Sequence, residues 1–170
     1  LKQKLELVLQ AREFAIEIGL NPKGSFTLYS EVDKDVLLWV VAGSKPDSFT
    51  LYNWWFPIVG YVPYKGFHDR EDAMAQGQIL REEGFEVFIR GADTFSTLGW
   101  FDDPVITPTL KRDNLNIINT VIHESVHSTV WIPNNVQFNE SLANFVGARG
   151  ALEFYKKHLP NKVPEASNAY

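Results

Sequence analysis

The sequence predicts an α+β fold in which a small mixed or antiparallel sheet packs on helices. Two observations carry this prediction. A strand, a helix and a second strand occur in this order along the chain, at residues 36–41, 68–83 and 85–90. Beyond them, residues 114–129 and 139–158 have the composition of two successive helices. With 170 residues, we expect one domain over residues 1–170 with a substantial core.

The N-terminal part of the chain is expected to supply one helix and several strands. Residues 2–19 repeat apolar side chains at roughly helical spacing and end at a glycine before an Asn-Pro turn. Runs rich in β-branched and aromatic residues then predict strands at residues 25–30, 36–41, 49–56 and 58–64. We interpret Trp54 and Trp55 as sheet-packing side chains, and a substrate groove is the less favoured alternative.

The next segment predicts the helix and the strand that complete the sheet layer. Asp69 is a candidate N-cap for the helix at residues 68–83, and Gly84 follows as its stop signal. Residues 85–90, with the sequence FEVFIR, alternate apolar and polar side chains as a strand does. At the other end of the chain, residues 160–170 are polar and contain proline, so we expect a loosely held tail.

Composition excludes several classes of function. The net charge is −5 without a basic cluster, which argues against nucleic-acid binding. The chain has no cysteine, so disulfides and thiolate zinc sites are excluded. No apolar run approaches the roughly 18 residues that a membrane span needs. An enzyme or a protein-binding domain fits these limits.

His123, Glu124 and His127 form an H-E-x-x-H motif. Two histidines four residues apart on a helix lie on one face, so both imidazoles can reach one metal ion. The intervening glutamate can face a metal-bound water, and it is the general base of zinc metallopeptidases with this motif. A surface helix with two unrelated histidines is the alternative. Apolar side chains at helical spacing through residues 114–129, after the candidate N-cap Asp113, favour a buried helix and the metal site.

A catalytic zinc site needs a third protein ligand and one open position. Glu140 begins the following helical stretch, and a helix–turn–helix return would bring it to both histidines. Its alternative role is an acid in the first helical turn, with Asn139 as the cap. Ala143 and Gly147 share its helical face and would allow a close approach of the two helices. Two residues farther along remain as alternative ligands, Glu153 and His158.

A second unusual stretch, STLGWFDDP, precedes the metal-binding motif. We expect residues 96–101 to lie at or next to a sheet edge that pairs with an extended substrate backbone. The substrate-binding candidates are Ser96, Thr97, Leu98, Gly99 and Trp100. A structural hairpin with a buried Trp100 is an equal alternative.

Three blocks of the sequence resemble the bacterial putative aminopeptidase family, a group of predicted zinc metallopeptidases. They are residues 67–73 with the helix after them, STLGWFDDP, and HESVH with FNESLANFV at residues 138–146. The resemblance implies a zincin-like, gluzincin-type fold with His123, His127 and Glu140 as zinc ligands and Glu124 as the base. Family members are usually longer at both ends, and many look like envelope proteins. The resemblance therefore also implies that this sequence is truncated and that the protein has a bacterial envelope or periplasmic location.

The expected function is zinc-dependent peptide hydrolysis by a metal-activated water, with Glu124 passing the proton to the leaving amine. A second donor to the oxyanion is expected, with Tyr155, Tyr64, His68 and Arg149 as candidates. Asn144 is a candidate acceptor for an imidazole N–H. Two alternatives remain: a zinc hydrolase of non-peptide amides or esters, and a non-enzymatic peptide-binding domain with a structural metal.

Overall fold

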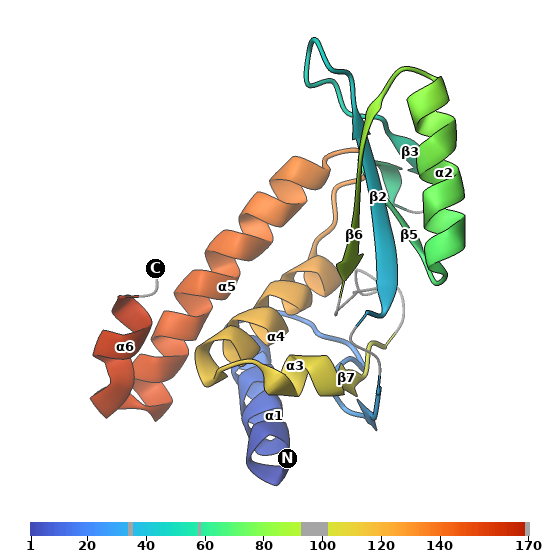
Figure 1. The fold of residues 1–170 in the computed structure, drawn as a ribbon. Coiled ribbons are helices and arrows are strands. Elements are labelled where there is room, and N and C mark those ends of the chain that lie inside the picture. Colours follow the sequence, from blue (N-terminus) through green and yellow to red (C-terminus); the bar gives the residue numbers. More distant parts are fainter. Residues whose placement is uncertain (34–35, 58, 93–101, 169–170) are drawn as a thin grey trace. The chain divides into compact units, whose positions relative to one another are not determined.

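The computed structural model describes residues 1–33, 36–57, 59–92 and 102–168 (Figure 1). It has the mixed α+β architecture that the sequence predicts. The chain forms two compact units. The helical unit comprises Leu1–Asp33, Ser96–Trp131 and Gln137–Tyr170, and the sheet unit comprises Lys34–Phe95 and Ile132–Val136. The expected single domain over residues 1–170 stays a prediction.

Three long helices form the helical unit together with short elements. The long helices are α1 (Lys2–Glu17), α4 (Asn114–Thr129) and α5 (Val136–His158). The short elements are β1 (Tyr29–Ser30), β7 (Val105–Ile106), α3 (Thr107–Lys111), the 3-10 helix η1 (Pro160–Lys162) and α6 (Val163–Ser167). Strands β1 and β7 pair in parallel.

The three long helices lie together (Figure 1), and their apolar side chains share one core. Helix α1 contributes side chains at helical spacing, as do α4 and the C-terminal half of α5. The fully or almost fully buried members include Val8, Phe14, Ile118, Ile122 and Phe154. Each such side chain contributes roughly 1.5–3 kcal/mol through its burial. The same burial fixes the rotation of α4 about its axis, and therefore the direction of its remaining faces.

Helix α4 has the bounds that the sequence predicts, because both its start and its buried face are encoded locally. The Asp113 carboxylate accepts a hydrogen bond from the backbone N–H of Asn116 at 2.9 Å, which confirms it as the N-cap. Ile117, Ile118, Val121 and Ile122 then turn toward the core and are fully buried.

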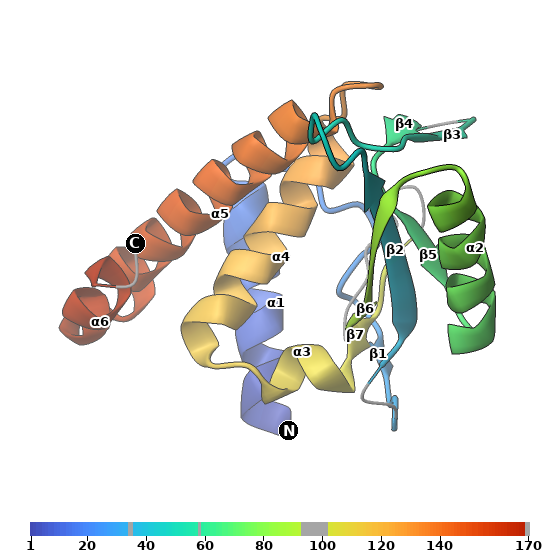
Figure 2. The ribbon, with the colours of Figure 1, turned by 45° about the horizontal axis from the view of Figure 1, so that its top comes forward.

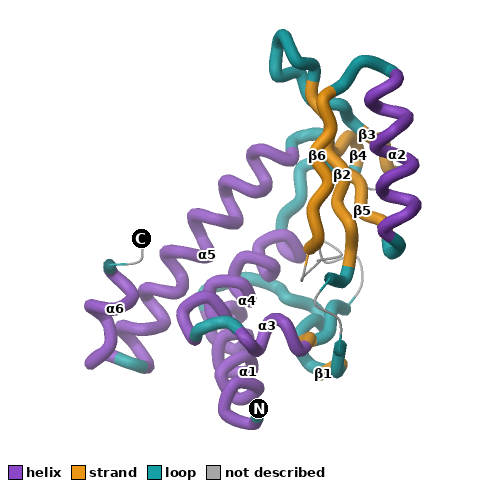
Figure 3. The backbone as a smooth tube through the Cα atoms, in the orientation of Figure 1, coloured by secondary structure: helices purple, strands orange, loops and turns teal. Residues whose placement is uncertain are grey.

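The sheet unit contains an antiparallel three-stranded sheet with one helix on a face (Figure 2). Its strand order is β5 (Lys65–Phe67), β2 (Leu38–Ser44) and β6 (Glu86–Ala92). Helix α2 (Arg70–Glu82) covers one face, where Val41 packs with Ala73 and Leu80. A separate hairpin pairs β3 (Trp54–Phe56) with β4 (Gly60–Val62), as the strands in Figure 3 show.

Several expected strands are shorter than their sequence pattern. The run at residues 25–30 is a strand only at Tyr29–Ser30, because Phe26 adopts a left-handed backbone with φ 64°. The run at 49–56 is a strand only at Trp54–Phe56, and Phe49 has φ 52°. Strands β5 and β7 and helix α3 were not predicted. A left-handed residue breaks an extended run, and this conformation depends on the surrounding contacts.

The C-terminal residues differ from the expected loose tail. Residues 160–167 form η1 and α6, and Ala166 is fully buried in the helical core. Val163 is partly buried against the same core, so two apolar side chains attach this segment. Within the described ranges, no helix has the length and apolar character needed to cross a membrane.

Candidate metal centre

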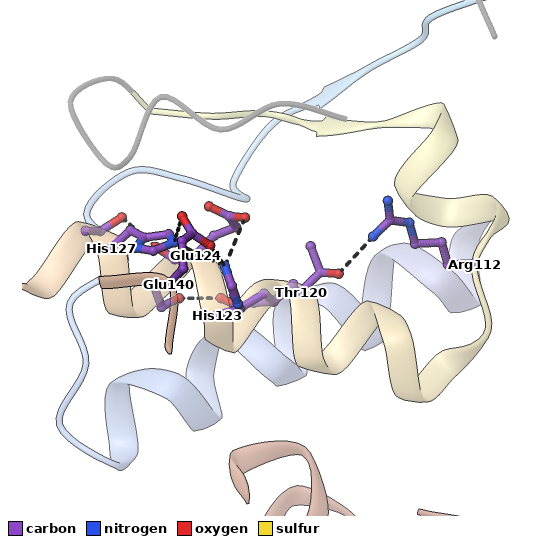
Figure 4. Close-up of polar contacts among 9 residues, drawn as sticks. Arg112, Thr120, His123, Glu124, His127 and Glu140 are labelled. Carbon is purple, nitrogen blue, oxygen red and sulfur yellow. Dashed lines mark hydrogen bonds and ion pairs between the residues drawn. The ribbon is translucent and has the colours of Figure 1, made fainter. Parts of the chain in front are cut away.

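Helix α4 presents His123, Glu124 and His127 on a face next to its buried apolar face (Figure 4). The Nε2 atoms of the two histidines are 3.1 Å apart. Their surroundings differ: the side chain of His127 is 2% exposed, whereas that of His123 is 17% exposed. The site is therefore closed beside His127 and open toward solvent on the His123 side.

Helix α5 brings Glu140 to both imidazoles, as the sequence predicts. One carboxylate oxygen lies 3.4 Å from Nε2 of His127, and the other lies 3.6 Å from Nε2 of His123. These three residues form a group that could hold a metal ion. Glu140 lies in the second turn of α5, and Asn139 is buried inside the helix rather than capping it. The alternative role of Glu140 as a capped first-turn acid is therefore wrong.

The spacing of the three ligands fits a tetrahedral ion. Imidazole nitrogen and carboxylate oxygen bind zinc at about 2.0–2.1 Å, so two ligands of a tetrahedral ion lie about 3.3 Å apart. The Nε2–Nε2 separation of 3.1 Å and the 3.4 Å between His127 and one carboxylate oxygen lie close to this value, and the 3.6 Å to His123 is measured from the other oxygen of the carboxylate. The two longer ones exceed the usual length of a direct hydrogen bond. Two imidazoles and one carboxylate are also a ligand set found in catalytic zinc sites.

Small residues on α5 allow its close approach to α4. A Cβ at Gly147 would clash with the Asn119 side chain and lie 3.2 Å from Cβ of His123. A Cβ at Gly150 would lie 3.0 Å from two carbon atoms of Ile122. Ala143 is fully buried on the same face. The prediction that small residues bring the two helices together is therefore confirmed at Gly147.

The ionisation of Glu140 favours cation binding. Interactions with His123 and His127 lower the pKa of Glu140 from its ordinary 4.5 to about 2, against the opposing effect of burial. Burial lowers the pKa of His123, but the contact with Glu140 and the charges of Glu124 and Glu140 outweigh it and raise the pKa overall. Asn144 adds to this rise through a side-chain interaction with His123. The carboxylate is therefore ionised at neutral pH.

Glu124 lies beside the group without joining it. Its Oε1 atom is 4.0 Å from Nε2 of His123. Its Oε2 atom is buried and has no hydrogen-bond partner among the described residues, and the same holds for Nδ1 of His127. A buried carboxylate oxygen needs a donor, because desolvation without a hydrogen bond is costly. A water molecule held between this oxygen and a metal ion would supply that donor.

The structure brings some of the other candidate residues to this centre and not others. Asn144 interacts with His123. Tyr155 lies in the helical core at 4% exposure, and its 15-residue separation from Glu140 corresponds to about 22 Å along α5. Tyr64 belongs to the sheet unit. The candidates at residues 96–100 lie outside the described residues.

Glu153 and His158, the two alternative metal ligands, make other contacts in the structure. Glu153 pairs with Arg149 and Lys156 on the exposed side of α5. His158 stacks on Phe154, with ring centroids 4.6 Å apart. Neither belongs to the group that could hold a metal ion among the described residues.

Sequence reasoning missed Trp131. Its ring centroid lies 5.6 Å from that of His127 in an edge-to-face arrangement. It follows His127 by four residues, but it lies beyond the end of α4, so helical spacing alone did not identify it. The motif search also did not single out Thr120, which accepts a hydrogen bond from Arg112 at 3.3 Å one turn before the centre (Figure 4).

The comparison with protein families covers nearly the whole chain. The model of the family described as "Putative aminopeptidase" matches residues 1–169. No curated protein and no solved structure matches the chain significantly. Because the match extends over both units, it includes the helices that carry the His123, His127 and Glu140 group. The chain belongs to the putative aminopeptidase family.

Proposed function

We propose that this protein is a zinc-dependent peptidase of zincin-like architecture, with His123, His127 and Glu140 as the ligands of one zinc ion. The observation that carries the proposal is the convergence of two Nε2 atoms and one carboxylate at 3.1, 3.4 and 3.6 Å. Three ligands leave one tetrahedral position for water, which is the arrangement of catalytic zinc sites. The family description supports a peptide as the substrate and release of N-terminal residues as the reaction.

Zinc bound here would supply the Lewis acidity that activates water and polarises a carbonyl. Glu124 is the general base in this proposal. Its buried oxygen, which has no hydrogen-bond partner among the described residues, would accept a proton from a water molecule at the open side of the group. The same carboxyl group then returns the proton to the amine that leaves when the peptide bond breaks.

The two histidines and Glu140 have the complementary role of holding the cation in place. Burial of His127 keeps one ligand rigid and shielded from water. Interaction with Asn144 orients His123, whose other contacts are the carboxylates of Glu124 and Glu140. The more exposed side of the group, at His123 and Glu140, is the side on which a peptide would enter.

The Glu124→Gln variant tests the assigned base. We expect it to keep one zinc ion per chain and to lose peptide hydrolysis by a factor of about 10²–10⁴. Metal analysis and initial rates on a mixed peptide library measure both quantities. Glu153→Gln is a matched control, since Glu153 is a half-exposed glutamate on α5 whose partners in the described part of the chain include the nearby cations Arg149 and Lys156. Undiminished hydrolysis by zinc-loaded Glu124→Gln would show that another group is the base.

A further inference from the structure

The two histidine rings of the candidate metal centre are held by different kinds of neighbour. His123 has polar neighbours, and Asn144 is one of them. The side chain of His127 is almost fully buried, and its Nδ1 atom has no hydrogen-bond partner among the described residues. A hydrogen bond at this second nitrogen is the common way to orient an imidazole that binds a metal. In the described part of the chain, packing against other rings takes that place for His127.

Two aromatic rings lie against the imidazole of His127. The ring of His123, one turn earlier on α4, has its centroid 4.8 Å away at an interplanar angle of 83°. The ring of Trp131 has its centroid 5.6 Å away at an angle of 68°. Both contacts are edge-to-face, which is a favourable arrangement for rings about 4.5–7 Å apart. His123 is itself a proposed metal ligand, so Trp131 is the neighbour that holds His127 independently of the metal.

The C-terminal end of α4 determines where Trp131 lies. The hydroxyl of Thr129 donates to the carbonyl four residues earlier at 2.6 Å and accepts a hydrogen bond from the backbone N–H of Asn21 at 2.8 Å. Val130 then ends the helix with an extended backbone, at φ −139° and ψ 124°. The chain therefore leaves a fixed helix end directly before Trp131. His127 and Trp131 both belong to the helical unit, so their contact lies within one compact unit.

The contact limits the orientations that the His127 ring can adopt. A histidine side chain turns about two torsions, and the second of them is broadly populated. Many of these orientations would direct Nε2 away from the carboxylate of Glu140. Trp131 occupies one side of the imidazole and disfavours such orientations. Apparent metal affinity falls in proportion to the fraction of molecules in the binding-competent conformation, so a neighbour that raises this fraction strengthens binding.

We infer that Trp131 is a positioning residue for the metal centre, which it serves by holding the His127 ring so that Nε2 faces His123 and Glu140. This inference rests on the proposed metal site. Trp131 acts through His127 and is not itself a ligand. Its loss should therefore weaken metal binding, and the effect should disappear when the imidazole of His127 is absent.

The test uses substitutions in the full chain. Trp131→Leu removes the aromatic ring but keeps an apolar side chain. Trp131→Phe keeps a ring that can pack edge-to-face on the imidazole. Trp55→Leu is the matched control, since Trp55 is 61% exposed on β3 in the sheet unit. Trp131→Leu is also made together with His127→Ala, in which the ring contact no longer exists.

The measurements are the zinc dissociation constant, by competition with a chromophoric chelator, and the melting temperature of the metal-free protein. We expect Trp131→Leu to weaken zinc binding about two- to tenfold, the range set by one aromatic contact. Trp131→Phe should retain most of the affinity, and Trp55→Leu should leave it unchanged. In the His127→Ala protein, the addition of Trp131→Leu should weaken zinc binding no further, because the two residues act as one unit.

Equal zinc affinity in Trp131→Leu and the unmodified chain would overturn the inference, whatever the melting temperatures. An equal loss of affinity with and without the His127 imidazole would also overturn it, since Trp131 would then act elsewhere. Failure of the unmodified chain to bind zinc would instead overturn the proposed function.

Discussion

The two helices that carry the proposed metal ligands, α4 and α5, are held in place by different kinds of interaction. Helix α4 has a side-chain N-cap at Asp113 and one apolar face, and its neighbours in sequence determine its bounds. Helix α5 begins three residues before the predicted start, and its close approach to α4 uses Gly147 and Gly150 as well as the apolar core that both helices share. The difference teaches that the histidine pair is positioned by local sequence, whereas the third ligand is positioned by tertiary contacts.

Among the variants that test this difference between α4 and α5, Gly147→Ala should have the largest effect on the free energy of unfolding. In an exposed helix this change would stabilise by up to about 1 kcal/mol, because alanine has the higher helix propensity. Here the added methyl group meets Asn119 and Cβ of His123, so the helices must separate. We expect the free energy of unfolding to fall by about 1–3 kcal/mol, as is typical of overpacking. Urea denaturation of the metal-free protein measures it.

Ser141→Ala is the control for Gly147→Ala. Ser141 is exposed on the same helix, so its replacement should change stability only by the small difference in helix propensity. A Gly147→Ala protein as stable as the Ser141→Ala protein would mean that α5 does not need a glycine where it meets α4.

A smaller effect is expected at the start of α4. Asp113→Ala removes the N-cap acceptor and should lower the free energy of unfolding by about 1 kcal/mol at neutral pH. Asp113→Asn keeps a hydrogen-bond acceptor, so its free energy of unfolding should fall much less. Thermal and urea unfolding of the two variants, at equal protein concentration, distinguish the cap from a general effect of the substitution.

The pH dependence sharpens this prediction. The hydrogen bond from the backbone of Asn116 lowers the pKa of Asp113 below its ordinary value of 3.8. A group whose folded pKa is lowered contributes stability above its unfolded pKa and loses it as the pH falls through the folded value. The advantage of the unmodified chain over Asp113→Ala should therefore be constant above about pH 5 and shrink below pH 4. An advantage that grows with acidity would contradict the assigned cap.

The sequence was informative where signals are local. The H-E-x-x-H spacing, the Asp113 cap and the apolar positions of α4 are short-range patterns, and α4 has the predicted bounds. Glu140 was also found by its spacing from the motif, although its place in the second turn of α5 was not. Helical periodicity and capping depend on neighbouring residues alone, so they can be read without tertiary information.

The features that the sequence did not predict depend on contacts between residues far apart in the chain. The left-handed backbone of Phe26 shortens a strand that its neighbours favour. Burial of Ala166 attaches a segment whose composition is that of a free tail. Tyr155 was a candidate oxyanion donor by residue type, but its helical phase places it in the core. None of these outcomes has a signature within a few residues of the position concerned.

The central claim is that one cation is held by two imidazoles from α4 and one carboxylate from α5. X-ray absorption at the zinc edge, on the full chain loaded with one equivalent of zinc, tests it most directly. The account predicts two nitrogen ligands and one protein oxygen at about 2.0–2.2 Å, with one nitrogen lost in His123→Ala and the protein oxygen lost in Glu140→Ala. A zinc coordination shell that is unchanged by both substitutions would contradict it.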